Sequence, residues 1–297
     1  MRNGVVVDTL NKIDTNEEEL ARLMIGQQII PPARNADVDT TAGGDILTFD
    51  HVSLKLKDGT QLLNDVSFTI HEGEIFGIAG VSGNGQDEIC DVISGAKIPT
   101  DGKLVFCGQD ITKMDIRQRN ASGIGYAPVD RYRDGMVMDM TLAENVFLKW
   151  SFDKRWIKRG FIDHKRLNAY TDELIEMHRV KATGYSDKAG SLSGGNQQKV
   201  VLGREVDLGS KLLVLNQPTR GLDMGAVDRI HHVIMEEKQK QKGVLLVSTE
   251  LSEIFEMCDR IAVMHNGSFM GIYRNGELTV EQIGLLMAGV HMEKEDA

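Results

Sequence analysis

The residues with the clearest chemical potential form the stretch GVSGNGQD, residues 80–87, between an apolar run and a helix-like run. The spacing from Gly80 to Gly85 matches the glycine-rich loop G-x-x-x-x-G-K-[ST], which binds phosphate through its backbone N–H groups. That chemistry also requires a lysine for the phosphate charge and a hydroxyl for Mg²⁺ directly after the last glycine. Here Gln86 and Asp87 occupy those two positions. The loop has the pattern of a phosphate site without its positive charge.

A second motif, LSGGNQQK, stands at residues 192–199 and keeps every polar group that anion binding needs. Ser193, Gly194 and Gly195 precede a helix-like run, and exposed N–H groups at a helix N-terminus bind anions. A helix cap followed by a glycine turn explains the same residues without any ligand. Its position 20 residues before the end of the apolar run LLVLN favours the functional interpretation.

Composition is ordinary for a soluble globular chain of 297 residues, with 41% hydrophobic and 26% charged residues. The formal net charge of −10 argues against a nucleic-acid partner, which requires a basic surface. Three cysteines without a C-x-x-C pair indicate a reducing compartment. No run approaches the roughly 18 apolar residues of a membrane span. We therefore expect a cytoplasmic chain that can dock on a membrane protein.

The strands that must position these motifs are readable from their apolar patterns. DILTFDHVSLKL and QLLNDVSFTI alternate apolar and polar residues, which predicts half-buried antiparallel strands. EIFGIA, KLLVLN and GVLLVST are continuously apolar, which is typical of strands buried on both faces of a parallel sheet. The pattern predicts an α/β nucleotide-binding core.

Helical signals interrupt that core between about residues 140 and 190. Thr141 and Glu144 have the spacing of a capping box, which marks a helix start. A second helix is predicted over 163–178, and its apolar residues recur at helical intervals. These apolar residues are Leu167, Tyr170, Leu174 and Met177. We expect a helical insertion over about 140–190.

The first residues of the chain have a second copy near its end. Residues 1–26 and 264–289 align without gaps and share seven identical positions, clustered in two blocks. Coincidence between two glycine-turn-helix pieces is one explanation. The other is that residues 1–29 are the tail of a preceding homologous domain, joined by a polar linker at 30–45 to a domain at 46–290. Residues 291–297 then form an acidic tail.

Taken together, the ordered motifs resemble the ATP-binding subunits of ABC transporters over essentially residues 46–290. LSGGNQQKVVLGRE is similar to the signature of the subfamily that imports simple sugars and nucleosides. GIAGVSGNGQ and QPTRGLD resemble the second of that subfamily's two fused nucleotide-binding domains. The resemblance implies an ABC-type P-loop α/β fold with a mixed sheet core, an antiparallel β subdomain and a helical subdomain.

The resemblance also assigns roles to positions in the two motifs and the strand ends. In this family two domains sandwich ATP between the phosphate loop of one and the LSGG element of the other. The family's Asp-Glu pair, for Mg²⁺ and water activation, falls at Asn216 and Gln217, and its switch histidine falls at Glu250. A family glutamate falls at Val129. The cofactor-binding residues of the degenerate phosphate loop are Gly80, Gly83, Gly85, Gln86 and Asp87. The degenerate catalytic positions are Asn216, Gln217 and Glu250.

The expected function is an ATP-binding component of an importer for nucleosides or simple sugars, peripheral on the cytoplasmic face of the membrane. ATP and Mg²⁺ are expected at a site shared with a second nucleotide-binding domain, with Ser193, Gly194 and Gly195 serving the partner's ATP. The chain's own loop would bind them weakly or not at all, hold no metal, and leave it inactive alone. Further partners are permease subunits and, indirectly, a solute-binding protein; the solute is not readable.

Two alternatives to that function remain at this stage. The first is a catalytically silent pseudo-ATPase with a structural or regulatory role. The second, an ABC protein acting on DNA or ribosomes, predicts basic extensions or zinc motifs that the chain lacks. Of the minor candidates, His231-His232 is interpreted as a solvated pair rather than a metal site. The basic, aromatic stretch 149–160 is interpreted as a docking surface near the permease.

Overall fold

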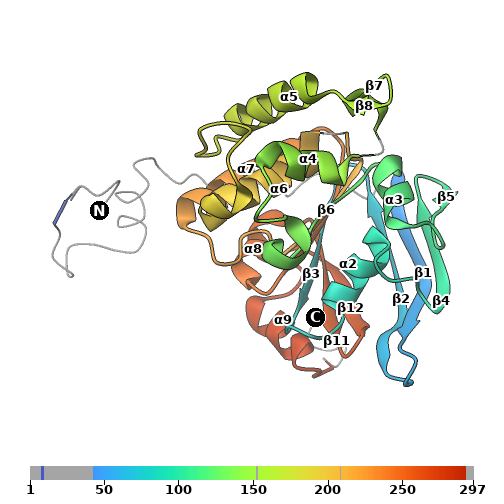
Figure 1. The fold of residues 1–297 in the computed structure, drawn as a ribbon. Helices are drawn as coiled ribbons and strands as arrows, with labels where there is room; N and C mark the ends of the chain where they lie inside the picture. The colour runs from blue at the N-terminus through green and yellow to red at the C-terminus, as the bar shows by residue number, and fades with distance from the viewer. Residues whose placement is uncertain (1–7, 10–42, 152, 208, 292–297) are drawn as a thin grey trace.

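The computed structural model describes residues 8–9, 43–151, 153–207 and 209–291. The predictions for the segments 1–29 and 30–45 and for the acidic tail fall almost entirely outside these residues. Figure 1 shows the described chain as a central sheet, with a β-sheet at one side and a helical layer at one end.

The antiparallel sheet contains the two alternating segments predicted from sequence. Its strand order is β2-β1-β4-β5, and β1 pairs antiparallel with both β2 and β4. The strands are β1 (Asp45–Lys55), β2 (Gln61–His71), β4 (Asp101–Phe106) and β5 (Gln109–Asp110). The antiparallel prediction is confirmed, because alternate residues of β1 and β2 face an apolar core.

The central sheet has six strands in the order β12-β11-β3-β10-β9-β6. All neighbours in it are parallel except the edge strand β12, which runs antiparallel to β11. The strands are β3 (Ile75–Gly80), β6 (Ile124–Ala127), β9 (Leu212–Asn216), β10 (Gly243–Ser248), β11 (Arg260–His265) and β12 (Ser268–Arg274). This mixed sheet confirms the predicted α/β class.

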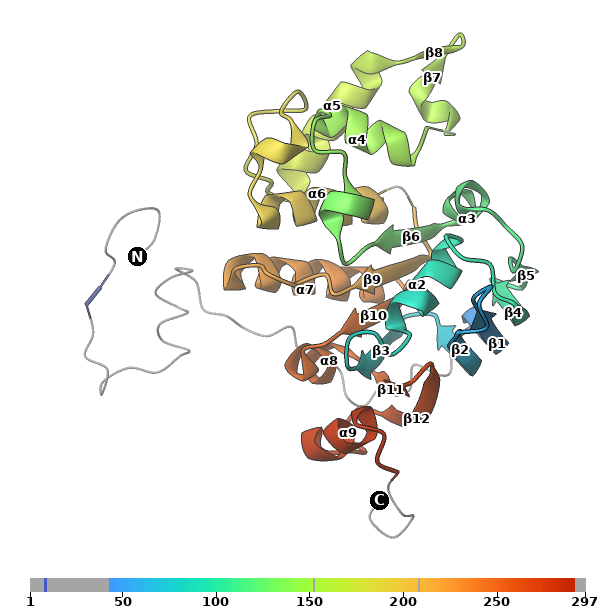
Figure 2. The same ribbon diagram turned by 60° about the horizontal axis from the view of Figure 1, so that its bottom comes forward.

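Continuous apolar runs form the middle of this sheet because both of its faces are covered. Leu213 and Leu215 of β9 belong to one buried cluster, whereas Leu212 and Val214 belong to a second cluster on the opposite face. The helices that flank the sheet, α2 (Gln86–Ser94), α3 (Ile116–Ser122), α7 (Met224–Gln239), α8 (Leu251–Met257) and α9 (Val280–Met287), are drawn in Figure 2.

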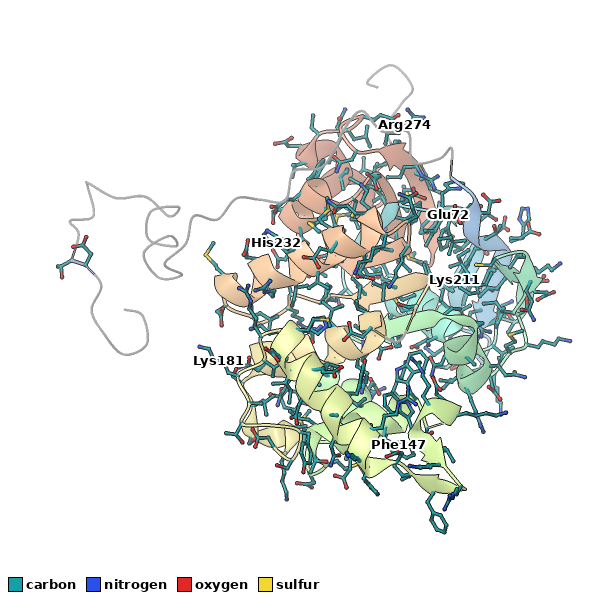
Figure 3. The ribbon with its side chains drawn as sticks, turned by 90° about the horizontal axis from the view of Figure 1, so that it is seen from above. Glu72, Phe147, Lys181, Lys211, His232 and Arg274 are labelled. Atoms are coloured by element: carbon teal, nitrogen blue, oxygen red, sulfur yellow. The ribbon has the colours of Figure 1, made fainter. Side chains whose placement is uncertain are left out.

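The helical layer comprises the elements between β6 and β9. They are η3 (Arg131–Gly135), α4 (Leu142–Lys149), η4 (Lys154–Trp156), the hairpin β7 (Ile157–Lys158) and β8 (Phe161–Ile162), α5 (His164–Met177), η5 (Ala189–Ser191) and α6 (Gly194–Asp207). The capping box of Thr141 and Glu144 at α4 is confirmed. Figure 3 shows this layer, with Phe147, at the opposite end of the molecule from Arg274.

Two expectations for this layer are wrong in part. Met177 was predicted on the apolar face of α5 but is 64% exposed, since it is the last residue of the helix and the chain turns away there. Trp150 and Trp156 in the stretch interpreted as a docking surface are 4% and 2% exposed. Their rings pack into the core of the helical layer, so the aromatic part of that stretch is structural.

A buried ionic network joins the helical layer to the sheet. The Glu205 carboxylate of α6 contacts Lys149 Nζ of α4 at 3.2 Å and accepts from the backbone N–H of Tyr126 in β6 at 3.2 Å. Arg204 contacts the same carboxylate at 3.0 Å and donates to the Asn145 carbonyl at 3.2 Å. Since these groups are buried and mutually paired, the network holds α6 in a defined position against β6 and α4.

A second buried cation, Arg119 of α3, holds the end of α2. Its guanidinium donates to the carbonyls of Val92 and Ile93 in the last turn of α2. It also donates to Thr112 at 3.0 Å and to Met114 at 2.9 Å. The Arg119 side chain is fully buried, and burial lowers its pKa to about 10. The helix that follows the phosphate-type loop is thus secured at its C-terminal end by another element.

Replacing Arg119 by Met is expected to lower the free energy of unfolding by about 2–4 kcal/mol. The methionine fills much of the space, but four buried carbonyls lose their charged donor. Urea unfolding followed by circular dichroism measures the change. Lys113→Met, an exposed change on the same segment, is the control and should stay within about 0.5 kcal/mol of the parent chain.

Candidate functional site

Three neighbouring strands of the central sheet bring the candidate residues together at one edge. β3, β10 and β9 are adjacent and parallel, so their carboxyl ends lie side by side. Residues 81–85 follow β3, Asn216 ends β9, and Glu250 follows β10 by two residues. The edge is the place where ligands bind in open α/β sheets.

The loop between β3 and α2 is held in place by glycines and by one asparagine. Gly85 has φ 114°, and a Cβ there would lie 2.5 Å from Met264 Cε and 3.2 Å from the Leu62 carbonyl. Only glycine fits such a position. Asn84 anchors the loop to the β11–β12 turn, because its side-chain oxygen accepts from Asn266 N at 3.1 Å and its carbonyl accepts from Gly267 N at 2.8 Å.

Gln86 is the residue in the lysine position of the loop pattern. Its side chain is 5% exposed, and its Nε2 donates to the Val81 carbonyl at 3.1 Å. A Cβ added to Gly80 would collide with this amide. The Gln86 side chain therefore closes the loop on itself and carries no charge toward a phosphate.

Asp87 and Asn216 meet across the edge. The Nδ2 of Asn216 at the end of β9 donates to Asp87 Oδ1 in the first turn of α2 at 2.7 Å. Asn216 is 1% exposed, whereas Asp87 is exposed. The loop pattern would put a magnesium-binding hydroxyl at position 87. In this chain a direct hydrogen bond joins the two elements.

Acidic side chains surround the N-terminal half of α2. Asp87 and Glu88 stand in its first turn, where the helix dipole stabilises acids by about 0.3–1 kcal/mol each. Burial raises the pKa of the Cys90 thiol well above its ordinary value, and the carboxylates of Asp87, Asp91 and Glu88 raise it further. Lys97 pairs with Glu88 and Asp91, but a polyanion at this helix end would meet Asp87 without a lysine at position 86.

Gln217 and Glu250 lie beyond the strand ends, on a surface cavity that they share. Gln217 has φ 49°, and its backbone N–H donates to the Val247 carbonyl at 2.8 Å. Glu250 precedes α8, its backbone N–H donates to Ser248 Oγ at 3.1 Å, and its side chain is exposed. Both side chains are thus available at the edge, and only Glu250 is charged.

Ser193, Gly194 and Gly195 stand at the start of α6, on a different part of the surface. Ser193 is exposed, and its Oγ accepts from Asn196 Nδ2 at 2.8 Å. A Cβ on Gly194 would lie 2.5 Å from Arg131 Nη2, so a larger residue here would displace the Arg131 guanidinium. Figures 1 and 2 both show α6 apart from α2. The structure does not bring this motif to the chain's own phosphate-type loop.

Arg131, to which no sequence pattern assigns a role, supports the start of α6. Its guanidinium lies against Gly194, and its Nε donates to Gln197 Oε1 at 3.2 Å. Because both glycines face packed neighbours, Arg131 on one side and Ala226 on the other, the helix start is confined. No local pattern around residue 131 indicates this contact.

The interpretation of His231-His232 as a solvated pair is wrong for His231. His231 is 6% exposed, and its Nε2 lies 3.0 Å from Glu253 Oε1, which also accepts from Thr219 Oγ1 at 2.8 Å. His232 is on the exposed side of α7. A signal was available, since His231 stands three residues before Ile234 and four before Met235 and so shares the apolar face of its helix.

Comparisons with known proteins show what the chain is similar to. A family model described as "ABC transporter" matches residues 63–220. A nucleoside import ATP-binding protein from Lactococcus lactis is 37% identical, and the match covers 97% of this chain and 57% of the relative. A guanosine import ATP-binding protein from Bacillus subtilis is 36% identical over 97% and 56% of the two chains. The chain thus spans a little over half the length of these relatives.

Solved structures share the fold. The crystal structure of a nucleotide-free ATP-binding cassette from an ABC transporter is 26% identical with a TM-score of 0.66, covering 79% of this chain and 93% of that one. A dimeric ATP-binding cassette in a post-hydrolysis state, bound to ADP and Pi, is 22% identical with a TM-score of 0.68. The match covers 78% of this chain and 100% of that cassette.

The hydrogen bond between Asp87 and Asn216 is expected to give a measurable coupling energy. A double-mutant cycle with Asp87→Ala and Asn216→Ala should show about 1 kcal/mol in urea unfolding, since the acceptor is charged but exposed. The matched control replaces Glu88, which pairs with Lys97, in a cycle with the same Asn216 change. That control coupling should be near zero. A zero coupling for the first pair would mean that the bond does not hold the two elements together.

Proposed function

The chain belongs to the ABC transporter family, and on that premise we propose that it is an ATP-binding component of an importer for nucleosides or simple sugars. Its relatives are named as nucleoside, guanosine and ribose import ATP-binding proteins. In this proposal the surface at the start of α6 takes part in ATP hydrolysis, whereas the chain's own phosphate-type loop is silent.

The bond from Asn216 to Asp87 is the observation that carries the silent half of the proposal. A site for Mg-ATP would need a positive side chain and a metal ligand at 86 and 87, and an acidic pair at 216 and 217. The residues present do not fit that group. The Gln86 amide is bonded within the loop, and the Asp87 carboxylate is bonded to an uncharged amide. No catalytic step is assigned to this edge.

The start of α6 supports the working half of the proposal. The Ser193 hydroxyl is exposed, and the helix N-terminus behind it has free N–H groups that suit a phosphate. Since this surface lies away from the chain's own loop, the phosphate it suits would belong to ATP on a second cassette. Ser193, Gly194 and Gly195 would then complete the partner's ATP and Mg²⁺ site.

A cleft between the core and the helical layer supports a permease as the membrane partner. It has a volume of about 850 Å³, and Lys97, Arg117, Val137 and Leu148 are among its lining residues. In the described part of the chain, no helix has the length and apolarity to span a bilayer. We propose that the chain is peripheral on the cytoplasmic face and that a permease loop enters this cleft, with a solute-binding protein acting indirectly.

The domain organisation stays part of the same proposal. The repeat between 1–26 and 264–289 supports residues 1–29 as the tail of a preceding homologous domain and 30–45 as a linker. The main domain would be 46–290, with its helical subdomain at about 140–190 and an acidic tail at 291–297.

The asymmetry is tested by ATP turnover of this chain paired with a cassette that has an intact phosphate loop. Ser193→Arg should reduce turnover of the pair by at least about 10²-fold, because it blocks groups that stabilise charge on the partner's phosphate. Binding of ATP to the partner's open site should change less than about twofold. Gln86→Lys should change turnover less than about twofold, since Asp87, Asn216, Gln217 and Glu250 remain.

The chain alone is the baseline of that experiment and should not hydrolyse ATP. If Ser193→Arg is harmless while Gln86→Lys alters turnover strongly, the working site has been assigned to the wrong surface. If neither variant nor the chain itself affects the partner's turnover, the silent pseudo-ATPase role is the correct one.

Permease docking is tested by cysteine cross-linking in a Cys107→Ser background, because Cys107 is the exposed native thiol among the described residues. Val137 lines the cleft and is exposed, and Asp139 is exposed two residues further along the chain, whereas Met136 is 5% exposed and unsuitable. Val137→Cys and Asp139→Cys should capture a permease subunit in membranes. Capture by Ser193→Cys alone would show that the docking cleft is wrongly assigned.

A further inference from the structure

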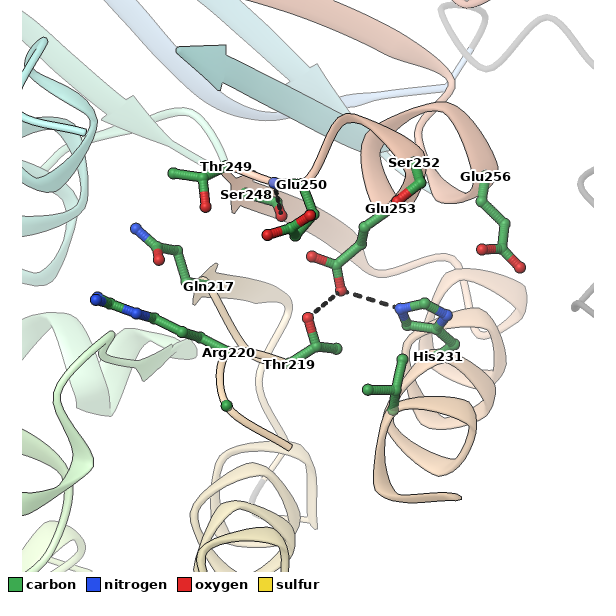
Figure 4. A pocket seen from close by; sticks show the side chains of 12 residues that line it. Gln217, Thr219, Arg220, His231, Ser248, Thr249, Glu250, Ser252, Glu253 and Glu256 are labelled. Atoms are coloured by element: carbon green, nitrogen blue, oxygen red, sulfur yellow. Dashed lines mark hydrogen bonds and ion pairs between the residues drawn. The ribbon is translucent and has the colours of Figure 1, made fainter. Parts of the chain in front are cut away.

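A cavity of about 350 Å³ opens between the segment after β9 and the helices α7 and α8. Figure 4 shows the side chains that line it. Three of its lining residues are the acids Glu250, Glu253 and Glu256. Glu250 belongs to the silent edge, but neither that edge nor the surface of α6 uses Glu253 or Glu256, so the function proposed above does not explain the cavity.

Glu253 is the informative residue in this cavity. It is 5% exposed, and its Oε1 accepts from Thr219 and lies against His231. Its other oxygen, Oε2, is buried and has no hydrogen-bond partner among the described residues. Figure 4 shows this oxygen turned away from Thr219 and His231, toward Glu250. A buried carboxylate oxygen without a donor is costly, and a ligand that donates to it removes the cost.

Arg220, the cation of the chain itself that lines the cavity, does not donate to Glu253 Oε2. Arg220 lines the same cavity, but Figure 4 shows its guanidinium turned away from Glu250 and Glu253. Glu250 and Glu253 come from the same helix start, and two neighbouring carboxylates on one wall of a cavity attract a cation. A guanidinium suits them better than a compact ammonium, since its planar fork can donate to both at once. Hydroxyls of Ser248, Thr249 and Ser252 on the same wall are further acceptors.

We propose that this cavity receives an arginine side chain from the partner cassette. The inference rests on the proposed function for the partner's identity, because Gln217, Arg220 and Glu250 place the cavity at the edge that would face the second cassette. The arginine donates to Glu253 Oε2 and to the Glu250 carboxylate. This contact would hold the two cassettes together beside the chain's own phosphate-type loop. It would not require a bound phosphate.

The chemistry of the cavity is tested on the intact 297-residue chain with N-acetyl-arginine amide as the probe. Amide NMR shifts at Gly221 and Ser252, which line the cavity, should saturate with a dissociation constant in the millimolar range. N-acetyl-citrulline amide has the same shape without the charge and should produce no saturable shift. Equal responses to the two probes would overturn the inference.

Variants separate the cavity from the general acidity of the chain. Glu253→Gln should weaken arginine-amide binding at least about tenfold, since it replaces the charged acceptor by a neutral amide. The matched control, Glu236→Gln, changes an exposed acid of α7 outside the cavity and should leave binding unchanged. Glu250→Gln is the second variant if Glu253→Gln does not fold, because its side chain is exposed. It should weaken binding at least about threefold.

The partner is tested by association of the two cassettes in analytical ultracentrifugation. Glu253→Gln should weaken association at least about tenfold, or Glu250→Gln in its place at least about threefold, and Glu236→Gln should have no effect. If association is insensitive while Ser193→Arg still abolishes turnover of the pair, the arginine contact is wrong and the proposed function stands. If the probe binds as expected but no cassette associates, the assignment to a partner cassette is wrong and the proposed function fails with it.

Discussion

The arrangement of the phosphate-type loop beside the central sheet depends on the hydrogen bond between Asp87 and Asn216. This bond joins the first turn of α2 to the end of β9, two elements that are 129 residues apart in sequence. Arg119 holds the other end of α2, so the helix is fixed at both ends by groups of the chain itself. A phosphate loop normally completes its charge balance with a ligand and a metal. Here Asp87 is instead hydrogen-bonded to the uncharged amide of Asn216.

Two helices of the fold, α2 and α6, begin after glycine-rich segments but differ in the side chains at their N-termini. Both present N–H groups at an N-terminus, which favours anions. At α2 the anion is already present as Asp87 and Glu88. At α6 the first residues are uncharged, and Ser193 is exposed. The two helix starts therefore differ in the charge of their side chains.

Buried ionic contacts, together with apolar packing, hold the helical layer against the sheet. Glu205 is bonded at once to β6, to α4 and to Arg204 of its own helix. Removing one partner of this carboxylate would leave a buried charge unpaired. The layer therefore keeps a defined position. The cleft proposed for the permease opens between this layer and the core, and Lys149 and Arg204 line it. A ligand there would touch the network directly.

The sequence by itself determined the strands, the capped helix at Thr141 and the uncharged loop, because each depends on residues close in the chain. Periodicity does not show which surface a distant segment covers. Tertiary structure alone decided that Trp150, Trp156 and Met136 are buried and that Met177 is exposed. It also brought His231 to Glu253, and Asn216 to Asp87. These pairings depend on which strands and helices become neighbours in space, which no local pattern specifies.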